Sequence, residues 1–347
     1  MKFSVPTTLM LTAVGCCAAL VGCVDSQSGG STQTIFEPTS GEASLLELLA
    51  AGPESVPHRG ERLVEIFDVD AGGQVTPLQY REQISVNASG AYSLEPIGVD
   101  TPVLPDAASF LIQQEGRAGY MFRYRDFRIR DFDQLVLNYH LVAVASEPQT
   151  IAGRAAELLS FSSVHEFGYD FEVWVDSLTG LALSTEVFDP SGALVQRVTY
   201  TSYVDGPPAG MVPHRPSNQE QLVDLGQPLA EQLGFPPALA QIVPDGYVLQ
   251  ELASVVDGDG VIWSKATYTD GIRPLFLLGG LQPKVQTAAG PAFVEASGIG
   301  PVGEDRLLGY KAGRILVLQG SYGDLGRIAV GDEPADEMQA FLESSLP

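Results

Sequence analysis

Apolar and polar residues alternate through three consecutive segments in the middle of the chain. The stretch that begins at Gly168 reads GYDFEVWVDSLTGLALSTEVFDPSGALVQRVTY, and its alternation breaks at DSLTG and at DPSG. A period of two residues places successive side chains on opposite faces of a strand. Pro and Gly in such short breaks are typical of hairpin turns. The pattern therefore predicts an antiparallel meander of three strands.

One face of this meander is predicted to be apolar. It consists of Tyr169, Phe171, Val173 and Val175 on the first strand and of Leu181, Leu183, Thr185 and Val187 on the second. Trp174 and Phe188 fall on the otherwise polar face, which indicates a curved sheet with a helix or a ligand over one side. If the sheet lines a groove, the candidate lining residues are Tyr169, Phe171, Val173 and Trp174. Packing in the core is the alternative role for these side chains.

Similar patterns predict further elements before the meander. Three strands are expected within 61–97, with turns at DAGG and NASG, and strands are also expected at 138–145 and 153–163. Helices are expected at 43–52 and 105–117.

A Pro- and Gly-rich segment at 205–218 predicts a boundary between two domains. Ser217 and Glu220 have the spacing of a capping box, which predicts a helix immediately after the boundary. Beyond that helix, the patterns predict a second antiparallel sheet over 245–280, two strands over 313–332, and a closing helix over 334–345 with Pro334 at its start.

The first 22 residues form a predicted lipoprotein signal. Lys2 supplies a positive end, and the apolar run that follows is too short to span a bilayer comfortably. The run ends in Leu20-Val21-Gly22-Cys23, which resembles the lipobox of bacterial lipoproteins. This resemblance implies cleavage before Cys23 and acylation of that residue, and stable anchoring requires more than one acyl chain. An ordinary signal peptide with a chance cysteine is the alternative.

The residues that follow the signal fit a tethered, exported protein. Cys23 is the last cysteine in the chain, so the mature protein would contain no disulfide. Residues 23–42 are rich in Ser, Thr, Gly and Gln, which predicts a flexible tether on the order of 25 Å long. In enterobacterial lipoproteins an Asp directly after the cysteine favours inner-membrane retention. Val24 occupies that place here, so the resemblance favours the outer membrane.

Composition and charge exclude several classes of function. Apolar residues make up 45% of the chain, which supports a packed core. A net charge of -24 argues against binding of nucleic acid, because phosphates would be repelled. The four His residues lack the spacing of a metal site, and the GIGPVG stretch at 298–303 lacks the helix that a dinucleotide site needs. Ser163, His165 and Asp170 lie close in sequence but without a nucleophile elbow. The sequence therefore predicts no enzyme, no cofactor and no metal.

Basic and aromatic residues are interleaved in the segment 117–131, which reads RAGYMFRYRDFRIRD. Arg123, Arg125 and Arg128 are the candidates for contact with anionic lipid headgroups or with an acidic peptide. The alternative is a strand whose arginines pair with the protein's own Asp and Glu.

Two regions of the sequence resemble the periplasmic sigma-E regulatory proteins of the RseB/MucB family. The likeness in the first region lies in NYHLVAV, in IAGRAAELLSF and in the meander. In the second region it lies in VPDGYVL, in ATYTDGI and in IAVGDEPADEMQAFLES. Residues 281–310 have no clear counterpart in the family.

The resemblance implies an α+β fold. A LolA-like incomplete antiparallel β-barrel closed by helices would occupy residues 43–206. A linker and helix would follow at 207–241, and a smaller antiparallel α+β domain at 242–347.

The resemblance also implies a role in regulation. It implies that the protein binds the periplasmic part of an inner-membrane anti-sigma factor and senses lipid or lipoprotein in a hydrophobic groove. A LolA/LolB-type lipoprotein carrier or acceptor of the outer membrane is the alternative, and a purely structural envelope lipoprotein is a third.

Overall fold

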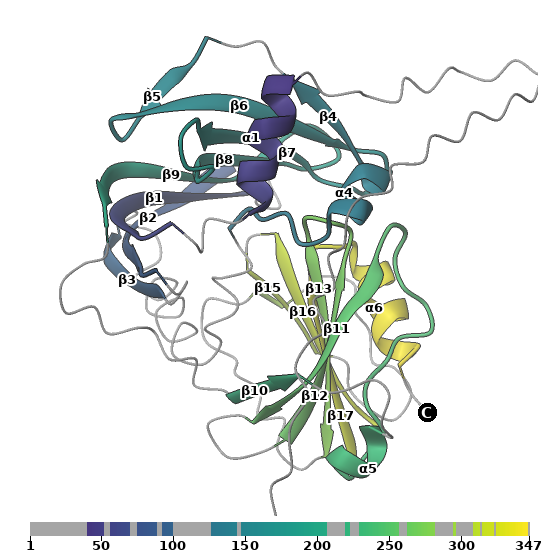
Figure 1. Ribbon diagram of the computed structural model, residues 1–347. Coiled ribbons are helices and arrows are strands. Elements are labelled where there is room, and N and C mark those ends of the chain that lie inside the picture. The colour runs from purple at the N-terminus through teal and green to yellow at the C-terminus, as the bar shows by residue number, and fades with distance from the viewer. Residues whose placement is uncertain are drawn as a thin grey trace, which may run out of the picture. The chain divides into compact units, whose positions relative to one another are not determined.

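The computed structural model describes most of the chain from residue 40 to residue 345. The described ranges are 40–51, 56–69, 75–88, 92–99, 126–143, 147–206, 219–222, 229–256, 262–281, 294–295, 308–312, 314–322 and 324–345. They form two antiparallel sheets with few helices (Figure 1). The predicted signal, nearly all of the tether, and the helix predicted at 105–117 lie outside the described residues.

The first sheet has nine strands and an open path. Its strands are β1 (His58–Val69), β2 (Val75–Val86), β3 (Tyr92–Val99), β4 (Tyr139–Ala143), β5 (Gln149–Ile151), β6 (Arg154–Ser163), β7 (Asp170–Asp176), β8 (Ala182–Phe188) and β9 (Leu194–Asp205). They follow the order β3-β2-β1-β9-β8-β7-β6-β4, with β5 paired to β6. Within the described residues the end strands β3 and β4 do not pair with each other. The sheet is therefore an incomplete barrel, and the predicted fold class is confirmed.

Helix α1 (Ser40–Ala50) covers part of this sheet (Figure 1). Its Leu45, Leu46 and Leu49 are buried in one core cluster with Phe171 and Val173 of β7. A second, shorter helix, α4 (Phe132–Asn138), begins after Asp131, whose side chain accepts a hydrogen bond from the backbone N–H of Gln134. This is an ordinary N-cap, so the local sequence sets where α4 begins.

A β-bulge divides the predicted apolar face of the meander. Phe171 pairs with Val187 and Trp174 with Ser184, but Val175 pairs with Ala182, so Leu183 is the extra residue. A bulge puts two residues opposite one and interrupts the alternation. Leu183 accordingly packs in a different core cluster from Val187. The prediction that both share one face is wrong, because a strict period of two takes no account of a bulge.

The second sheet has eight strands and is also antiparallel throughout. Its strands are β10 (Gln219–Leu222), β11 (Val248–Val256), β12 (Ile262–Thr269), β13 (Pro274–Leu281), β14 (Val294–Glu295), β15 (Leu308–Ala312), β16 (Ile315–Tyr322) and β17 (Leu325–Gly331). Their order is β10-β11-β12-β13-β17-β16-β15-β14. Helix α5 (Leu229–Leu233) precedes β11, and helix α6 (Ala335–Glu343) follows β17. This is the predicted smaller α+β unit.

The two ends of this second unit give opposite outcomes for the sequence prediction. Helix α6 begins directly after Pro334, as predicted, and buries Met338, Phe341 and Leu342 in the core. Glu220, predicted to cap a helix, instead lies in β10, where it pairs with Val255 of β11. Pairing with a strand distant in sequence overrides the local capping pattern. The exact domain boundaries at 206/207 and 241/242 stay predictions.

No helix in the described ranges is both long enough and apolar enough to cross a membrane.

Substitution of Gly180 tests how tightly α1 packs on the sheet. It has a φ of +74°, and a Cβ at this position would lie 2.5 Å from the carbonyl group of Leu48 in α1. We expect Gly180→Ala to lower the free energy of unfolding by about 2–4 kcal/mol, because left-handed strain and a steric clash add together. Urea unfolding of the full chain measures this.

Gly192 provides the matched control for Gly180. It has a φ of +81°, but a Cβ there would meet nothing within 4 Å. Gly192→Ala should therefore show only the backbone strain, about 1–2 kcal/mol. Equal losses in the two variants would contradict the packing of α1 described above.

Candidate functional site

The turn between β12 and β13 contacts the core of the nine-stranded sheet. Ile272 in this turn is 3% exposed and clusters with Phe127, in the segment before α4, and with Phe171 of β7. Gly271 precedes it with a φ of +110°, and a Cβ at this position would collide with the backbone of Leu135 in α4. Only glycine permits this close approach. We call residues 270–273, together with Arg130, Asn138 and Tyr139, which form hydrogen bonds to them, the seam.

Hydrogen bonds donated from both sheet regions hold the seam together. They run from the backbone N–H of Arg130 to the oxygen of Gly271 (2.8 Å), from Arg130 Nε to the oxygen of Ile272 (2.9 Å), from Asn138 Nδ2 to the oxygens of Gly246 (2.9 Å) and Asp270 (2.9 Å), and from Gln250 Nε2 to the oxygen of Arg130 (2.8 Å). Asn138 is the last residue of α4 and donates two of these hydrogen bonds, so this short helix contributes directly to the seam.

Asp270 organises the turn itself. Its Oδ1 accepts the backbone N–H groups of Ile272 (3.0 Å) and Arg273 (2.7 Å), and its Oδ2 accepts Arg273 Nε (2.6 Å). The hydroxyl of Tyr139 donates to the same Oδ2 at 2.7 Å. Asp270 has no exposed surface, and these four hydrogen bonds occupy both of its carboxylate oxygens. One side chain thus shapes the turn and binds it to β4.

Arg273 joins the turn to the segment before α6. Its Nη1 lies 2.7 Å from Glu333 Oε1 and 3.6 Å from Asp332 Oδ1, and Arg314 forms a second ion pair with Asp332. With Asp270, the cluster holds three carboxylates and two guanidinium groups, all buried. Fully ionised, the cluster would carry one negative charge in excess.

Burial and charge shift the protonation of this cluster. Burial raises the pKa of Glu333 to about 7, with Arg273 opposing the shift and Asp332 adding to it. A proton held there would remove the excess negative charge. Burial also raises the pKa of Tyr139 well above its ordinary value, and Asp270 adds to this shift, so the phenol stays a donor.

Two tyrosine rings complete the surroundings of the arginines. The Arg273 guanidinium lies 5.5 Å from the ring centre of Tyr169 and 5.2 Å from that of Tyr247, and Arg314 lies 5.8 Å from Tyr169. These contacts are within the range of cation–π interactions. Arg314 also reaches Gln196 of β9, with 3.4 Å between Nε and Oε1. Residues of both sheets therefore surround each arginine.

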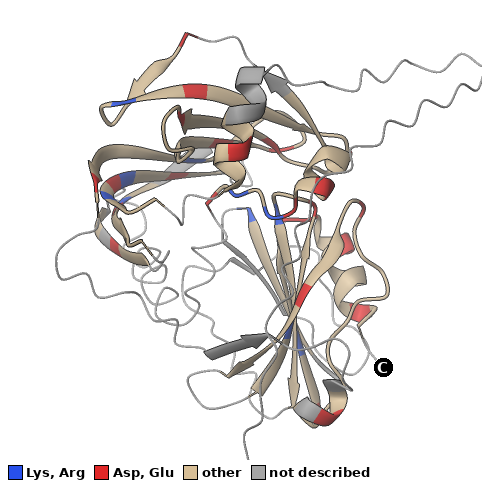
Figure 2. Ribbon diagram, in the orientation of Figure 1, with Lys and Arg blue, Asp and Glu red and all other residues tan. Residues whose placement is uncertain are grey.

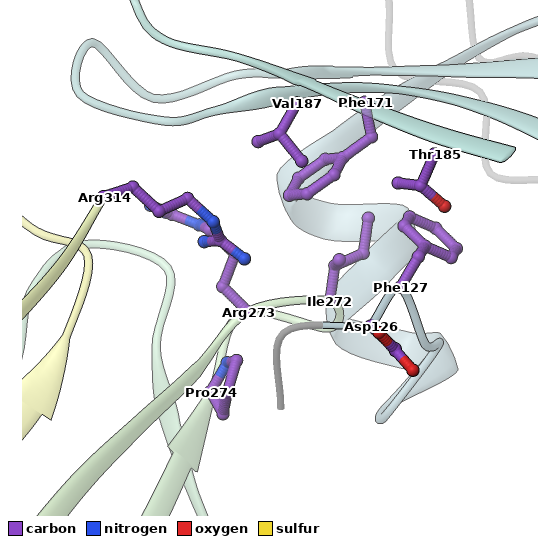
Figure 3. A pocket seen from close by; sticks show the side chains of 9 residues that line it. All are labelled: Asp126, Phe127, Phe171, Thr185, Val187, Ile272, Arg273, Pro274 and Arg314. Atoms are coloured by element: carbon purple, nitrogen blue, oxygen red, sulfur yellow. The ribbon is translucent and has the colours of Figure 1, made fainter. Parts of the chain in front are cut away.

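A pocket opens at the seam and is lined from both sheets (Figure 3). Its enclosed space is only about 10 Å³, which is room for about one water molecule. The lining residues are Asp126, Phe127, Phe171, Thr185, Val187, Ile272, Arg273, Pro274 and Arg314. Asp126 is paired with Arg62 at 2.7 Å. Apolar side chains thus form one wall, and the two arginines stand at the other.

The residues predicted to line a groove separate in the structure. Phe171 lines the pocket, and Tyr169 faces the two arginines beside it. Val173 is fully buried in the cluster with α1, and Trp174 packs on the other cluster, near Tyr200. Neither of these two is among the lining residues. Their role in binding a ligand stays a prediction.

The predicted basic patch is only partly described. Arg123 and Arg125 lie outside the described residues, whereas Arg128 is half-buried directly after the pocket residue Phe127. Contact of these arginines with a partner or with headgroups stays a prediction.

Sequence reasoning missed Asp270, Arg273 and Arg314. The TDGIRP turn contains Asp270 and Arg273. A polar turn in a sequence gives no indication that another sheet will bury it.

Ser163, His165 and Asp170 are close in sequence, but their side chains do not form a catalytic arrangement. Asp170 Oδ1 accepts the backbone N–H of Ser163 at 2.8 Å, and the Ser163 hydroxyl accepts the backbone N–H of His165. The His165 ring instead contacts Asn138, with 2.7 Å between Nε2 and Oδ1. Among the described residues, no group of three or more His, Cys, Asp or Glu side chains is placed to hold a metal ion.

Glu333 makes the stability of the seam dependent on pH. The folded state holds the Glu333 proton more tightly than the unfolded chain, in which the pKa is about 4.5. This contribution to stability is complete below about pH 4.5 and is lost as the pH rises toward 7. We expect the free energy of unfolding of the native chain to fall between about pH 5 and about pH 8. The fall should exceed that of Glu333→Gln by on the order of 1–2 kcal/mol.

Chemical denaturation across this pH range measures the difference. The exposed Glu157 of β6 offers a matched control, because Glu157→Gln removes the same group from a solvated position. Its profile should follow that of the native chain. Parallel profiles for the native chain and Glu333→Gln would show that Glu333 does not hold this proton.

Comparisons with known proteins identify part of the chain. The family model of the MucB/RseB N-terminal domain matches residues 102–220. No curated protein matches the sequence.

Among solved structures, the crystal structure of MucB in complex with MucA(peri) is 15% identical, with a TM-score of 0.46, and the alignment covers 88% of this chain and 98% of that chain. The Pseudomonas aeruginosa MucA/MucB complex is 16% identical, with a TM-score of 0.44 and coverages of 86% and 96%. A crystal structure of MucB alone is 16% identical, with a TM-score of 0.46 and coverages of 87% and 96%.

Because these TM-scores lie below 0.5, the assignment rests on the family model. The described part of the matched segment runs from Asp126 through the meander and includes α4 and Tyr139. The resemblance predicted from the sequence is confirmed for residues 102–220, which match the MucB/RseB N-terminal domain.

Proposed function

We propose that this protein binds the periplasmic segment of an inner-membrane anti-sigma factor and thereby regulates an envelope-stress response. The match of residues 102–220 to the family model of the MucB/RseB N-terminal domain supports this role. A bound segment would be shielded from proteolysis until a stress signal releases it. The role is one of binding rather than of catalysis.

The observation that carries the proposal is a pocket built by both sheets. Phe171 and Val187 contribute from the nine-stranded sheet, while Ile272, Arg273 and Arg314 contribute from the eight-stranded sheet (Figure 3). A segment that contacts both sheets gains from two linked sites at once.

A lipid ligand is less well supported than a protein segment. Small-molecule sites have volumes of roughly 300–1,000 Å³, whereas the enclosed space of the pocket at the seam is only about 10 Å³. A LolA/LolB-type carrier would need an apolar cavity for acyl chains. Sensing of acyl chains or lipoprotein, and the carrier role, therefore rank below binding of an anti-sigma segment.

The proposed location is the periplasm, with attachment to a membrane through acylated Cys23. The lipobox-like sequence and the tether after it support this anchoring. Val24 favours the outer membrane over the inner. A tether on the order of 25 Å would keep the two sheets close to the membrane surface.

Hydrogen exchange tests whether the partner binds at the seam. We expect addition of the anti-sigma segment encoded nearest the gene to slow amide exchange in 126–139, 245–250 and 270–274 by roughly fivefold or more, because bound backbone opens less often. The exposed turn at 189–193 should remain unchanged and serves as the internal reference.

The full mature chain is used for this measurement. Binding that protects residues of one sheet alone would contradict the seam as the site. Absence of any binding by calorimetric titration, together with transfer of a lipoprotein to this protein, would favour the carrier instead.

Substitution of Cys23 tests the anchor. Cys23→Ser should convert a membrane-bound protein into a soluble exported one, because no other cysteine follows the predicted cleavage site. The double variant Cys16→Ser/Cys17→Ser keeps Cys23 and should stay bound to the membrane. Cell fractionation and labelling with palmitate provide the readouts, and labelling that persists in Cys23→Ser would exclude Cys23 as the acylated residue.

A further inference from the structure

The outer face of α4 exposes an apolar surface next to the seam. Its members are large apolar side chains that are 45% or more exposed, namely Phe132, Val136, Leu137, Val164 and Phe167. We call these five residues the α4 patch. Val136 is 64% exposed and Leu137 is 67% exposed, so both could be replaced without disturbing a core. Clusters of this kind on soluble proteins commonly mark sites of interaction.

One backbone hydrogen bond joins the two segments of the α4 patch. Phe132 and Val136 are four residues apart on the helix and therefore share a face, and Leu137 follows directly. The backbone N–H of Val164 donates to the oxygen of Asn138, the last residue of α4, at 3.0 Å. The segment with Val164 and Phe167 thus lies against the end of the helix.

The inner face of the same helix belongs to the seam. Leu135 is buried in the core, and Asn138 donates to Gly246 and Asp270 of the eight-stranded sheet. Asn138 also contacts His165, which follows the patch residue Val164 in the chain, so the α4 patch adjoins the seam. A partner bound at the seam would therefore reach the α4 patch without leaving the surface of the protein.

Acidic side chains are interspersed with the apolar ones. Asp133 lies on the exposed face of α4, Glu166 lies between Val164 and Phe167, and Asp245 precedes Gly246; all three are exposed. Figure 2 shows the acidic position on α4 in red. In the described ranges none of these three carboxylates forms an ion pair with a lysine or arginine. The patch is thus apolar with an unneutralised negative border.

We propose that the α4 patch docks a basic amphipathic segment, one in which Lys or Arg residues flank apolar side chains. This inference rests on the proposed function and names the chemistry that the bound segment presents. Apolar side chains of the segment would cover Val136 and Leu137, and its cations would meet Asp133, Glu166 and Asp245. Charge complementarity of this kind raises the association rate and selects the partner.

Charge disfavours the two other occupants of such a surface. A second copy of the chain would place like carboxylates opposite each other across a two-fold axis. An anionic membrane would repel both the acidic border and a protein of net charge -24. A basic segment is the occupant whose charge fits.

Two pairs of substitutions in the full mature chain test the apolar and the charged parts of the patch separately. Val136→Ser/Leu137→Ser removes apolar contact, and Asp133→Lys/Glu166→Lys reverses charge. The matched controls are Leu178→Ser, 76% exposed on the turn after β7, and Glu157→Lys/Glu231→Lys, on exposed positions of β6 and α5. Melting temperatures confirm that each variant is folded.

The first probe is the anti-sigma segment encoded nearest the gene. We expect both patch variants to bind it at least about tenfold more weakly by calorimetric titration, and the charge-reversed variant to lose the dependence on salt. The control variants should stay within about twofold of the native chain. If the segment binds and the patch variants match the native chain, the α4 patch is not the docking surface, while the proposed function stands.

The second probe is a synthetic amphipathic Leu/Lys peptide, with a Leu/Glu peptide of the same pattern as its control. Patch-dependent binding of the Leu/Lys peptide, without binding of the Leu/Glu peptide, would support the inference. Failure of the anti-sigma segment to bind would contradict only the proposed function. Equal binding of both peptides would overturn the inference. Patch-dependent binding to phosphatidylglycerol vesicles would assign the patch to a membrane, and a patch-dependent dimer in sedimentation would assign it to a second copy.

Discussion

The buried guanidinium of Arg273 is the group on which the rest of the structure depends. It pairs with Asp270 in its own turn and with Glu333 before α6, and Asp270 in turn accepts the hydroxyl of Tyr139 in the nine-stranded sheet. Desolvation of these charges is costly, and only a complete set of partners offsets it. The network therefore favours one arrangement of turn, helix and sheet over all others, because any shift would leave a buried charge without its partner.

That requirement explains why α4 can serve two purposes. Its inner side is committed to the seam through Leu135 and Asn138, so the position of the helix is fixed by packing and by hydrogen bonds. Its outer side takes no part in this network, and its exposed apolar residues do not hold the fold together. A helix held rigidly from within can present a recognition surface at little cost in conformational entropy, since the surface is ordered before a partner arrives.

Elements defined by local patterns could be predicted from the sequence, whereas contacts between distant segments could not. The meander and helix α6 follow from alternation, from turn residues and from Pro334, all of which act over a few residues. The bulge at Leu183 and the strand position of Glu220 depend on pairing with other strands. The seam is the clearest case: the TDGIRP turn looks like an ordinary hairpin turn, and its burial depends on α4 more than 130 residues earlier.

The seam also couples folding to binding. Pocket residues such as Ile272 and Phe171 belong to the core cluster that holds the turn in place, so the site cannot change shape without a cost in stability. A partner that contacts both sheets would bind only the arrangement in which the turn at 270–273 is packed on the nine-stranded sheet. Its binding free energy therefore adds to the stability of that arrangement. Conversely, any condition that weakens the network, such as deprotonation of Glu333, lowers the population that can bind. If the proposed partner binds at the seam, its affinity and the stability of the seam depend on the same buried charge cluster.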